Sequence, residues 1–316
     1  MLTKGALARA GGTLAATRRR ETARATTVFV LPALFFIIVF IAYPIVHSFQ
    51  LSLTEWNGLA KVQPTNVGFA NWNALLHDSE FWYAFGNNVR IVVLSILIQL
   101  PIGMGLGFLF DTYGRKLNFF KIAYFVPYLM SSMAIGLLFR YAVDPNFGII
   151  KFFTTLFGGR PLDLLGHPSR ALYTVIGVVC WQYIPFYMVY FLAGYSSMPT
   201  DVYEAAIIDG AKRGQYFWRI VLPLLRPTIK NACVLSLVGS LKYFDLIYVM
   251  TGGGPKYATS GVLHGATELM ATYMYRNAFT IRKMGYGSVV AMGLFIIVTV
   301  ISAVTLFLMN RKEEAL

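Results

Sequence analysis

Long apolar runs separated by short polar segments dominate the pattern of this chain. About 20 apolar residues in a helix cross the hydrocarbon core of a bilayer, and six runs approach or exceed this length. The expected spans are residues 27–50, 84–110, 119–142, 171–197, 228–250 and 284–309. The pattern therefore predicts an all-α integral membrane protein with six transmembrane helices, in one domain over residues 26–310.

The segment between the fourth and fifth expected spans, residues 199–227, is polar and punctuated by glycine, unlike an ordinary short loop. We expect Thr200 or Asp201 to cap a first helix, with Glu204 completing a capping box. Gly210 then breaks this helix, because glycine adopts backbone angles that other residues avoid. A second helix restarts after it and ends at the Leu-Pro and Arg-Pro pairs. The segment is predicted to be a helix–turn–helix with an acidic first turn and a basic second half.

The same segment resembles the signature loop of one transporter family, the permease subunits of binding-protein-dependent ABC importers. The pattern E-A-A-x-x-x-G-x(9)-I-x-L-P is present without a gap, and its Asp-Gly-Ala centre is similar to the carbohydrate-uptake, maltose-type branch. The residues that carry the resemblance are Glu204, Ala205, Ala206, Asp209, Gly210, Ala211, Ile220, Leu222 and Pro223. The resemblance implies that they form a coupling helix, which sits in a cleft of the ATPase subunit. The alternative is an interfacial helix that lies on the lipid headgroups.

The resemblance extends over nearly the whole chain from about residue 24. Similar elements precede the second span, open the third and sixth spans, and end the fifth. They are Gly68-Phe69-Ala70-Asn71-Trp72, Phe125-Val126-Pro127-Tyr128, Gly285-Tyr286-Gly287-Ser288 and Phe244-Asp245-Leu246-Ile247. The family implies three partners: a homologous second permease subunit, a dimer of ATP-binding subunits and an extracytoplasmic solute-binding protein. It also implies a bacterial or archaeal inner membrane, with ATP and Mg bound by the partner ATPase and no cofactor on this chain.

The distribution of Lys and Arg predicts the orientation, because cytoplasmic loops carry an excess of positive charge. Sixteen of these residues fall on the face that holds both termini and residues 199–227, and eight fall in the loops opposite. Both termini are therefore predicted to be cytoplasmic, with a disordered basic tail at 1–25 and a short tail at 311–316. The net charge of +13 reflects this topology and does not indicate nucleic-acid binding.

The composition argues against several other classes of protein. The chain is 57% hydrophobic and 13% charged, which a soluble domain of this size does not need. It contains no zinc-ligand spacing, no catalytic serine motif and no G-x-x-x-x-G-K-[ST] phosphate loop. We therefore expect no metal site and no catalytic residues, and ATP-driven transport requires an ATPase on another polypeptide. A membrane-embedded enzyme is disfavoured because the four histidines are scattered along the chain.

Small residues in the apolar runs predict close packing of helices. Gly103, Gly105 and Gly107 of the second span recur at spacings that let helices approach one another. Cys180 and Cys233 both lie in apolar runs. We expect them to be small core residues rather than a disulfide or a metal pair.

Polar and aromatic residues inside the third, fourth and fifth spans are the candidates for a substrate path. Lys242 and Asp245 lie three residues apart and are expected to share a helix face, where they either line the path or form a structural ion pair. Prolines loosen the third and fourth spans, which is tolerated beside a cavity. Aromatic rings with nearby hydroxyl and amide groups suit a sugar, and the resemblance places carbohydrate contacts on the same spans. The candidates are Tyr128, Ser132, Gln182, Tyr183, Phe186, Lys242, Tyr243 and Asp245.

The leading interpretation is a permease subunit of an ABC importer for a sugar or related polyol, coupled to a separate ATPase by alternating access. The alternative is an ion-gradient-driven secondary transporter that uses Lys242 and Asp245. That alternative needs no docking loop, and the inverted repeats that many such transporters show are not visible here. Stable association with an ATPase separates the two interpretations.

Overall fold

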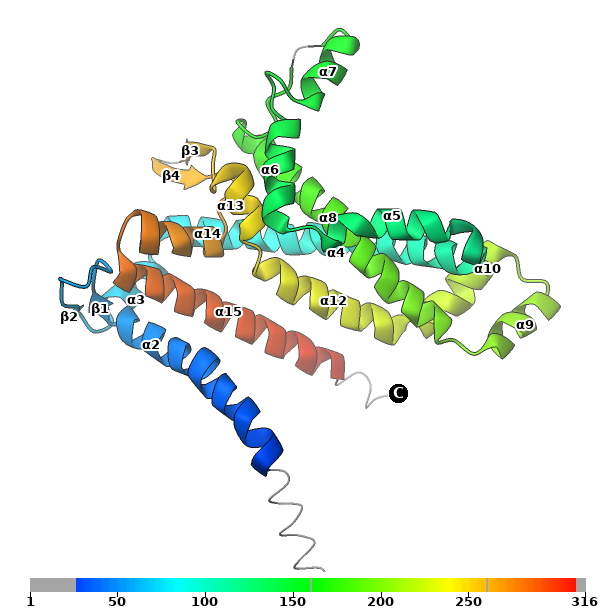
Figure 1. Ribbon diagram of the computed structural model, residues 1–316, viewed down its shortest axis with the longest axis horizontal. Helices are drawn as coiled ribbons and strands as arrows, with labels where there is room; N and C mark the ends of the chain where they lie inside the picture. Colours follow the sequence, from blue (N-terminus) through cyan, green and yellow to red (C-terminus); the bar gives the residue numbers. More distant parts are fainter. Residues whose placement is uncertain (1–26, 160, 260, 311–316) are drawn as a thin grey trace, which may run out of the picture.

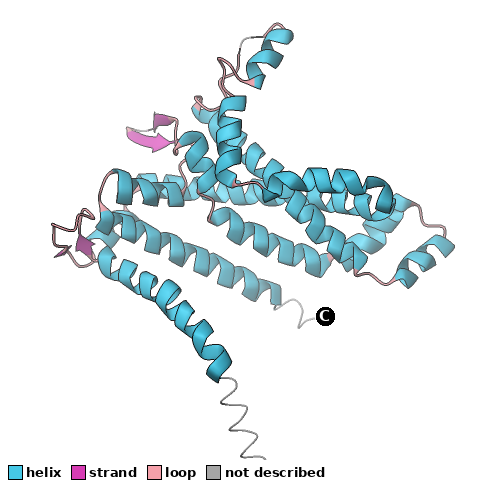
Figure 2. Cartoon of the chain, viewed as in Figure 1, coloured by secondary structure: helices cyan, strands magenta, loops and turns pink. Residues whose placement is uncertain are grey.

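The computed structural model describes residues 27–159, 161–259 and 261–310. The predicted tails at 1–25 and 311–316 lie outside this part of the chain. Within it, helices dominate and two small antiparallel hairpins are the only strands (Figure 2). The expected fold class, an all-α membrane protein, is therefore confirmed in that the described chain is mainly helical.

The helices and strands follow one another along the chain with short connections. The long helices are α2 (Tyr43–Ser52, continuous with helical turns from Thr27), α4 (Ser79–Tyr113), α5 (Asn118–Leu129), α6 (Ser132–Ala142), α8 (Pro168–Ser196), α12 (Arg226–Leu241) and α15 (Met284–Asn310). The short helices are α3 (Ala70–Leu76), α7 (Ile149–Leu156), α9 (Thr200–Ile208), α10 (Arg213–Tyr216), α11 (Leu222–Leu224), α13 (Asp245–Thr251) and α14 (Met270–Tyr275). The hairpins are β1 (Thr54–Glu55) with β2 (Thr65–Asn66), and β3 (Lys256–Thr259) with β4 (Val262–Gly265).

Four helices in the described ranges are long and apolar enough to cross a membrane. Two further helix pairs pass the same test only as bent units, so the number of spans is between four and six. The single helices are Thr27–Ser52, Ser79–Tyr113, Pro168–Ser196 and Met284–Phe307; the bent pairs are Asn118–Leu129 with Ser132–Ala142, and Arg213–Leu224 with Arg226–Leu241. The bends are 96° and 69° respectively. The chain is therefore a multi-pass membrane protein, in which each bent pair is either one broken span or a re-entrant loop.

Two of the expected spans, residues 119–142 and 228–250, are each interrupted by a helix break. α5 ends two residues after Pro127, and Met130 and Ser131 adopt extended backbone angles before α6 begins. α12 ends at Leu241, and the chain turns through Lys242 to Phe244 before α13. Proline removes a helical hydrogen bond, and irregular backbone at membrane depth is tolerated where protein or a cavity satisfies it.

Close contact between α4 and α8 forms the centre of the bundle. A Cβ added to Gly103 would lie 2.7 Å from the Cβ of Tyr187, and one on Gly107 would lie 3.0 Å from the Met188 carbonyl oxygen. The packing predicted from these two glycines is thus confirmed, because any larger residue would separate the two backbones. Gly105 faces open space, so the prediction is wrong at that position.

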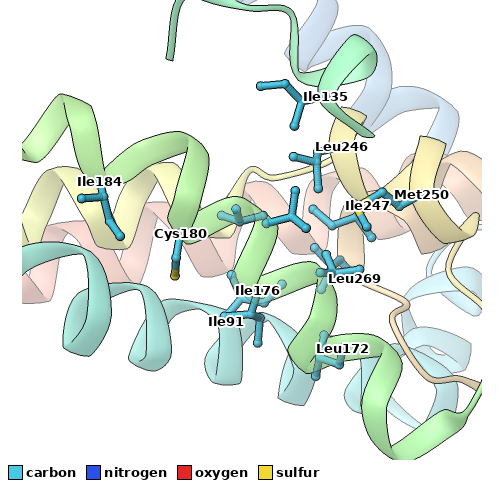
Figure 3. Packing of buried hydrophobic residues seen from close by; sticks show 13 residues of the cluster. Ile91, Ile135, Leu172, Ile176, Cys180, Ile184, Leu246, Ile247, Met250 and Leu269 are labelled. Carbon is cyan, nitrogen blue, oxygen red and sulfur yellow. The ribbon is translucent and has the colours of Figure 1, made fainter. Parts of the chain in front are cut away.

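Buried aliphatic side chains surround this contact (Figure 3). Ile91 of α4 packs with Ile176 and Cys180 of α8, and Leu246 and Ile247 of α13 complete the cluster. Both cysteines of the chain are free thiols, and Cys180 is buried in this cluster. Their predicted role as small core residues, without a disulfide, is confirmed.

The ends of the bundle differ in character (Figure 1). The β1–β2 hairpin and α3 lie at one end, beside the start of α15. At the opposite end, α9 projects away from the other helices after the end of α8. The segment predicted to dock a partner is therefore the most protruding part of that end.

Candidate functional site

Four aromatic rings from three parts of the chain meet near the two helix breaks. Tyr128 of α5 stacks on Phe186 of α8, with ring centroids 5.3 Å apart and an interplanar angle of 30°. Tyr183 lies one turn away on α8, 5.9 Å from Tyr128 and 5.3 Å from Tyr243, which stands in the break after α12. These four residues, called here the aromatic cluster, are all sequence-predicted candidates that the fold brings together.

The α5–α6 break is tied to α8 by one amide side chain. Gln182 Nε2 donates to Ser132 Oγ at 3.1 Å and to the Met130 carbonyl oxygen at 3.5 Å. Gln182 is 2% exposed, and its Oε1 atom has no hydrogen-bond partner among the described residues. The Gln182 side-chain N–H thus bonds the Met130 carbonyl oxygen, which the helix break leaves without a helical partner. The Gln182 Oε1 atom can still accept a hydrogen bond.

A small cavity of about 240 Å³ adjoins the aromatic cluster. Its lining includes Ser132, Tyr183, Lys242, Tyr243 and Asp245. Pockets that hold a drug-sized ligand are commonly about 300–1,000 Å³, so this is a narrow part of any path in the present conformation. Five of the eight candidates for the substrate path therefore line this cavity, Tyr128 and Gln182 contact lining residues, and Phe186 joins the group through Tyr128.

The expectation that Lys242 and Asp245 share one helix face is wrong. Lys242 caps the end of α12, and Asp245 is the first residue of α13, so the break separates them. Both side chains are exposed, and no ion pair joins them in the described part of the chain. The structural ion pair is thereby excluded in this conformation, and both charged groups face the cavity region instead.

The segment after α8 forms the expected two helical pieces around a glycine turn. α9 covers Thr200–Ile208, Gly210 follows with φ +72°, and α10 continues into a π-helical turn at Phe217–Val221. The Ala211 backbone N–H donates to the Ala206 carbonyl at 2.9 Å and closes the turn. The positive φ explains the glycine, because residues with a Cβ adopt this region only at a cost.

Two details of this segment differ from the sequence prediction. Pro199 precedes the first helical residue and no side chain caps α9, so neither Thr200, Asp201 nor Glu204 forms the expected capping box. The Leu-Pro and Arg-Pro pairs begin α11 and α12 rather than end a helix. Proline fits the first turn of a helix, where its missing N–H has no partner in any case.

The nine residues of the signature divide into an outward and an inward group. Glu204, Ala205, Asp209, Gly210 and Pro223 are exposed, whereas Ala206 is buried and Ala211, Ile220 and Leu222 are half-buried. Large apolar side chains accompany the outward group: Ile208 is 83% exposed and Trp218 is 66% exposed. Exposed apolar groups beside charged ones are typical of a surface that binds another protein or the membrane surface.

Aromatic and cationic contacts join this segment to the end of α4. Tyr203 of α9 and Tyr216 of α10 lie 5.3 Å apart, and Tyr216 also contacts Phe108 of α4. Arg213 NH1 donates to the Tyr113 hydroxyl at 3.4 Å, with its guanidinium over that ring at 5.6 Å. The segment is thus packed against the end of α4.

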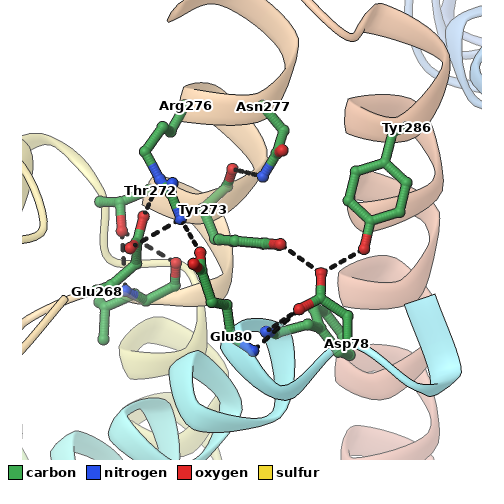
Figure 4. A network of polar contacts seen from close by, with 10 residues as sticks. Asp78, Glu80, Glu268, Thr272, Tyr273, Arg276, Asn277 and Tyr286 are labelled. Carbon is green, nitrogen blue, oxygen red and sulfur yellow. Dashed lines mark hydrogen bonds and ion pairs between the residues drawn. The ribbon is translucent and has the colours of Figure 1, made fainter. Parts of the chain in front are cut away.

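A polar network at the opposite end of the bundle was not predicted (Figure 4). Asp78 caps α4 by accepting from the Glu80 backbone N–H at 2.9 Å, and its second oxygen accepts from the hydroxyls of Tyr273 and Tyr286. Asp78 therefore joins α4, α14 and α15 at one point. The sequence Asp-Ser-Glu before α4 was the available signal, since Asp followed by Glu is typical of a helix start.

Arg276 completes this network, called here the outer network because the charge asymmetry of the sequence predicts that this end lies opposite the cytoplasmic face. It pairs with Glu80 and binds Glu268 through Nε at 2.8 Å and NH2 at 3.1 Å. Burial raises the pKa of Glu268, and Arg276 opposes this rise. One guanidinium thus pairs with two carboxylates at this end of the bundle.

Comparison with known proteins places these features in a family. Residues 99–312 match the family described as "Binding-protein-dependent transport system inner membrane component". An ABC transporter permease protein of Pyrococcus horikoshii is 33% identical over 291 residues, which cover 90% of this chain and 96% of that protein. The trehalose/maltose transport system permease protein of Thermococcus litoralis is 29% identical over 269 residues, 85% of this chain and 88% of its own length.

A solved structure shares the fold. It is a bacterial ABC transporter involved in the import of the acidic polysaccharide alginate, matched with a TM-score of 0.78 and 20% identity over 95% of this chain and 99% of the other. These relatives give no support to the ion-gradient-driven alternative. The chain belongs to the family of inner membrane components of binding-protein-dependent transport systems and is a permease subunit of an ABC importer.

Proposed function

We propose that this permease forms part of the translocation path for a sugar or related polyol. The observation that carries the proposal is the aromatic cluster, which lies beside the Gln182–Ser132 pair and the cavity at Lys242. Aromatic faces pack against the C–H surface of a sugar ring, while amide, hydroxyl and charged groups bind its hydroxyls. Relatives named for trehalose/maltose and alginate transport support the same class of substrate.

The proposed path lies between six spans, two of which are interrupted. In this arrangement both termini and residues 199–227 face the cytoplasm, and the outer network faces the solute-binding protein. A second, homologous permease subunit completes the path across the membrane. The charge asymmetry of the sequence supports this orientation.

Residues 199–227 are proposed to be the coupling segment. The exposed side chains of α9 and the Gly210 turn dock on a partner ATPase, which binds ATP and Mg. Closure of the ATPase dimer moves the docked segment, which shifts α4 through the contacts of Tyr216 and Arg213 and α8 through its direct connection to α9. The bundle then opens outward to accept substrate from the solute-binding protein.

Isolation of the chain from its native membrane tests this assignment. We expect an ATP-binding subunit, a second six-span chain and a solute-binding protein to co-purify in mild detergent and to be identified by mass spectrometry. The isolated solute-binding protein is then screened for sugar ligands by calorimetry. Recovery of the chain alone, under conditions in which a control importer stays assembled, contradicts the proposal.

Loss of the Tyr128 ring is expected to weaken sugar transport. In Tyr128→Ala the stack on Phe186 and the edge contact to Tyr183 both disappear. Since removal of a pocket contact is commonly worth a factor of ten or more, we expect uptake at limiting sugar to fall about tenfold. Radiolabelled uptake into proteoliposomes with the complete importer measures the change.

Tyr141→Ala is the matched control for this experiment. Tyr141 lies on α6, is 55% exposed and contacts Phe147 instead of the aromatic cluster. Its truncation is expected to leave uptake unchanged. Equal losses for the two variants, or no loss for Tyr128→Ala, contradict the assignment of the cluster to the path.

A further inference from the structure

A second row of aromatic rings begins where the aromatic cluster ends. Phe244 follows Tyr243 in the chain and stacks on Tyr248 of α13, with ring centroids 5.1 Å apart and an interplanar angle of 18°. Tyr275 at the end of α14 lies 4.9 Å from Tyr248. Its ring also lies 5.3 Å from Phe244 and 5.0 Å from Phe279. The four residues Phe244, Tyr248, Tyr275 and Phe279 are called here the aromatic row.

A cavity of about 590 Å³ lies beside this row. Its lining includes Tyr248, Arg140 of α6, and Arg276 and Thr280 from the segment after α14. This volume falls in the range of about 300–1,000 Å³ that is common for ligand pockets, unlike the cavity of about 240 Å³ at the aromatic cluster. Phe244 lines the smaller cavity and Tyr248 lines the larger one, so the aromatic row connects the two.

The exposure and charge of this region argue against a surface that only meets lipid. Tyr248 is 37% exposed and Phe279 is 55% exposed. Arg140 is also exposed, donates from NH1 to the Val249 carbonyl of α13 at 3.4 Å, and forms no ion pair with a described residue. Ionisable residues in membrane-spanning segments almost always face the protein interior or a water-filled cavity. The larger cavity is therefore expected to hold water or a polar ligand rather than lipid.

The aromatic row leads from the aromatic cluster toward the outer end of the bundle. α12 begins beside residues 199–227, and α13 follows the break at its other end. α13 packs against α6, which is the second piece of the other bent pair (Figure 1). The larger cavity also shares Arg276 with the outer network. In the proposed orientation, a sugar released by the solute-binding protein meets the aromatic row before the aromatic cluster.

Successive rings beside polar groups suit a chain of sugar residues. Each ring offers an apolar face to the C–H surface of one sugar residue. The Thr280 hydroxyl and the Arg140 guanidinium at the larger cavity are the kinds of group that bind sugar hydroxyls. The smaller cavity alone is below the common volume of a ligand pocket. Together with the larger cavity, it extends the site over several sugar residues.

We propose that the aromatic row and the larger cavity form an outer binding site for an oligosaccharide. This site holds one part of the sugar chain while the leading end lies at the aromatic cluster. The inference rests on the proposed function as a sugar permease. It narrows the substrate class to oligosaccharides, in preference to monosaccharides and disaccharides, and it adds α13 and the segment after α14 to the residues that bind substrate.

Truncation at the centre of the aromatic row tests the proposal. The probe is the radiolabelled tetrasaccharide of the sugar that the solute-binding protein retains in the calorimetric screen. We expect Tyr248→Ala to lower its uptake at limiting concentration about tenfold, because the chain loses a stacking contact. Tyr248→Phe keeps the ring and is expected to retain wild-type uptake. Proteoliposomes with the complete importer measure both variants.

Tyr173→Ala is the matched control, because Tyr173 is a 60% exposed tyrosine of α8 that lines neither cavity. It is expected to leave tetrasaccharide uptake unchanged. Normal uptake by Tyr248→Ala, or an equal loss in Tyr248→Phe, overturns the outer site. Loss of the second permease subunit from the purified Tyr248→Ala complex assigns the aromatic row to a subunit interface and overturns the site as well.

The same screen separates failure of this inference from failure of the proposed function. A solute-binding protein that retains no sugar contradicts the proposed function itself. A solute-binding protein that retains a monosaccharide or disaccharide but no tetrasaccharide leaves the proposed function intact and overturns only the oligosaccharide site.

Discussion

Glu204→Arg and Gly210→Pro are each expected to abolish sugar uptake while the chain still inserts into the membrane. Gly210 holds φ at +72°, and proline is restricted to about −65°, so the substitution must rebuild the turn between α9 and α10. A Cβ at Gly210 meets no atom within 4 Å, so the effect arises from the backbone and the docked partner rather than from internal packing. Glu204 is exposed, so charge reversal changes only the surface offered to the partner.

Uptake and ATPase activity of the reconstituted importer measure this effect. We expect both variants to be found in the membrane at the wild-type level, with ATP hydrolysis no longer stimulated by the loaded binding protein. Gly214→Ala is the matched control: it lies in α10 of the same segment, without a positive φ and in open space. Normal uptake by both test variants would show that the segment does not couple the ATPase to transport.

Arg276→Gln is expected to cause the largest loss of stability at the outer end of the bundle. It leaves the carboxylates of Glu80 and Glu268 without their shared partner, and the Glu268 side chain is only 5% exposed. Removal of one member of a buried ion pair costs about 3–5 kcal/mol, because the remaining charge stays desolvated. Glu80 is 28% exposed, so we expect the lower end of this range.

Thermal unfolding of the detergent-purified complex measures this loss. Lys283→Gln removes the same charge from the same segment, where Lys283 is exposed and forms no ion pair with any described residue. It is expected to leave the melting temperature unchanged. Equal shifts for Arg276→Gln and Lys283→Gln would indicate a general charge effect rather than a buried network. A second test is Glu268→Gln in the Arg276→Gln background, which should recover part of the loss.

The uninterrupted spans were predictable because each is formed by one long, continuous apolar run of the sequence. α4, α8 and the helix that ends at Ser52 fall within a few residues of the ranges expected from hydropathy. The breaks in the third and fifth spans were not predicted, since an apolar run gives the same signal whether the helix is straight or bent. Pro127 marked the first break, but nothing comparable marks the turn after Leu241.

The candidate substrate residues were found because polar and aromatic groups are conspicuous in apolar spans. Their mutual contacts were not predictable in detail: Gln182 reaches the Met130 carbonyl only because α5 and α6 separate there. The pairing of Lys242 with Asp245 failed for the same reason, since the expected helix ends between them. The outer network joins residues almost 200 positions apart, such as Arg276 and Glu80, and no local pattern reveals such a contact.

The close approach of Gly103 to Tyr187 has a mechanical consequence for α8. This helix has 29 residues and at 1.5 Å per residue is about 43 Å long. It contains Pro185, where a missing hydrogen bond weakens a helix against bending. The α4 backbone packs closely against α8 immediately after that point, so the two helices resist bending together. In the proposed mechanism, one end of this helix pair carries the coupling segment and its middle carries the proposed sugar contacts, so a displacement of the coupling segment moves both together.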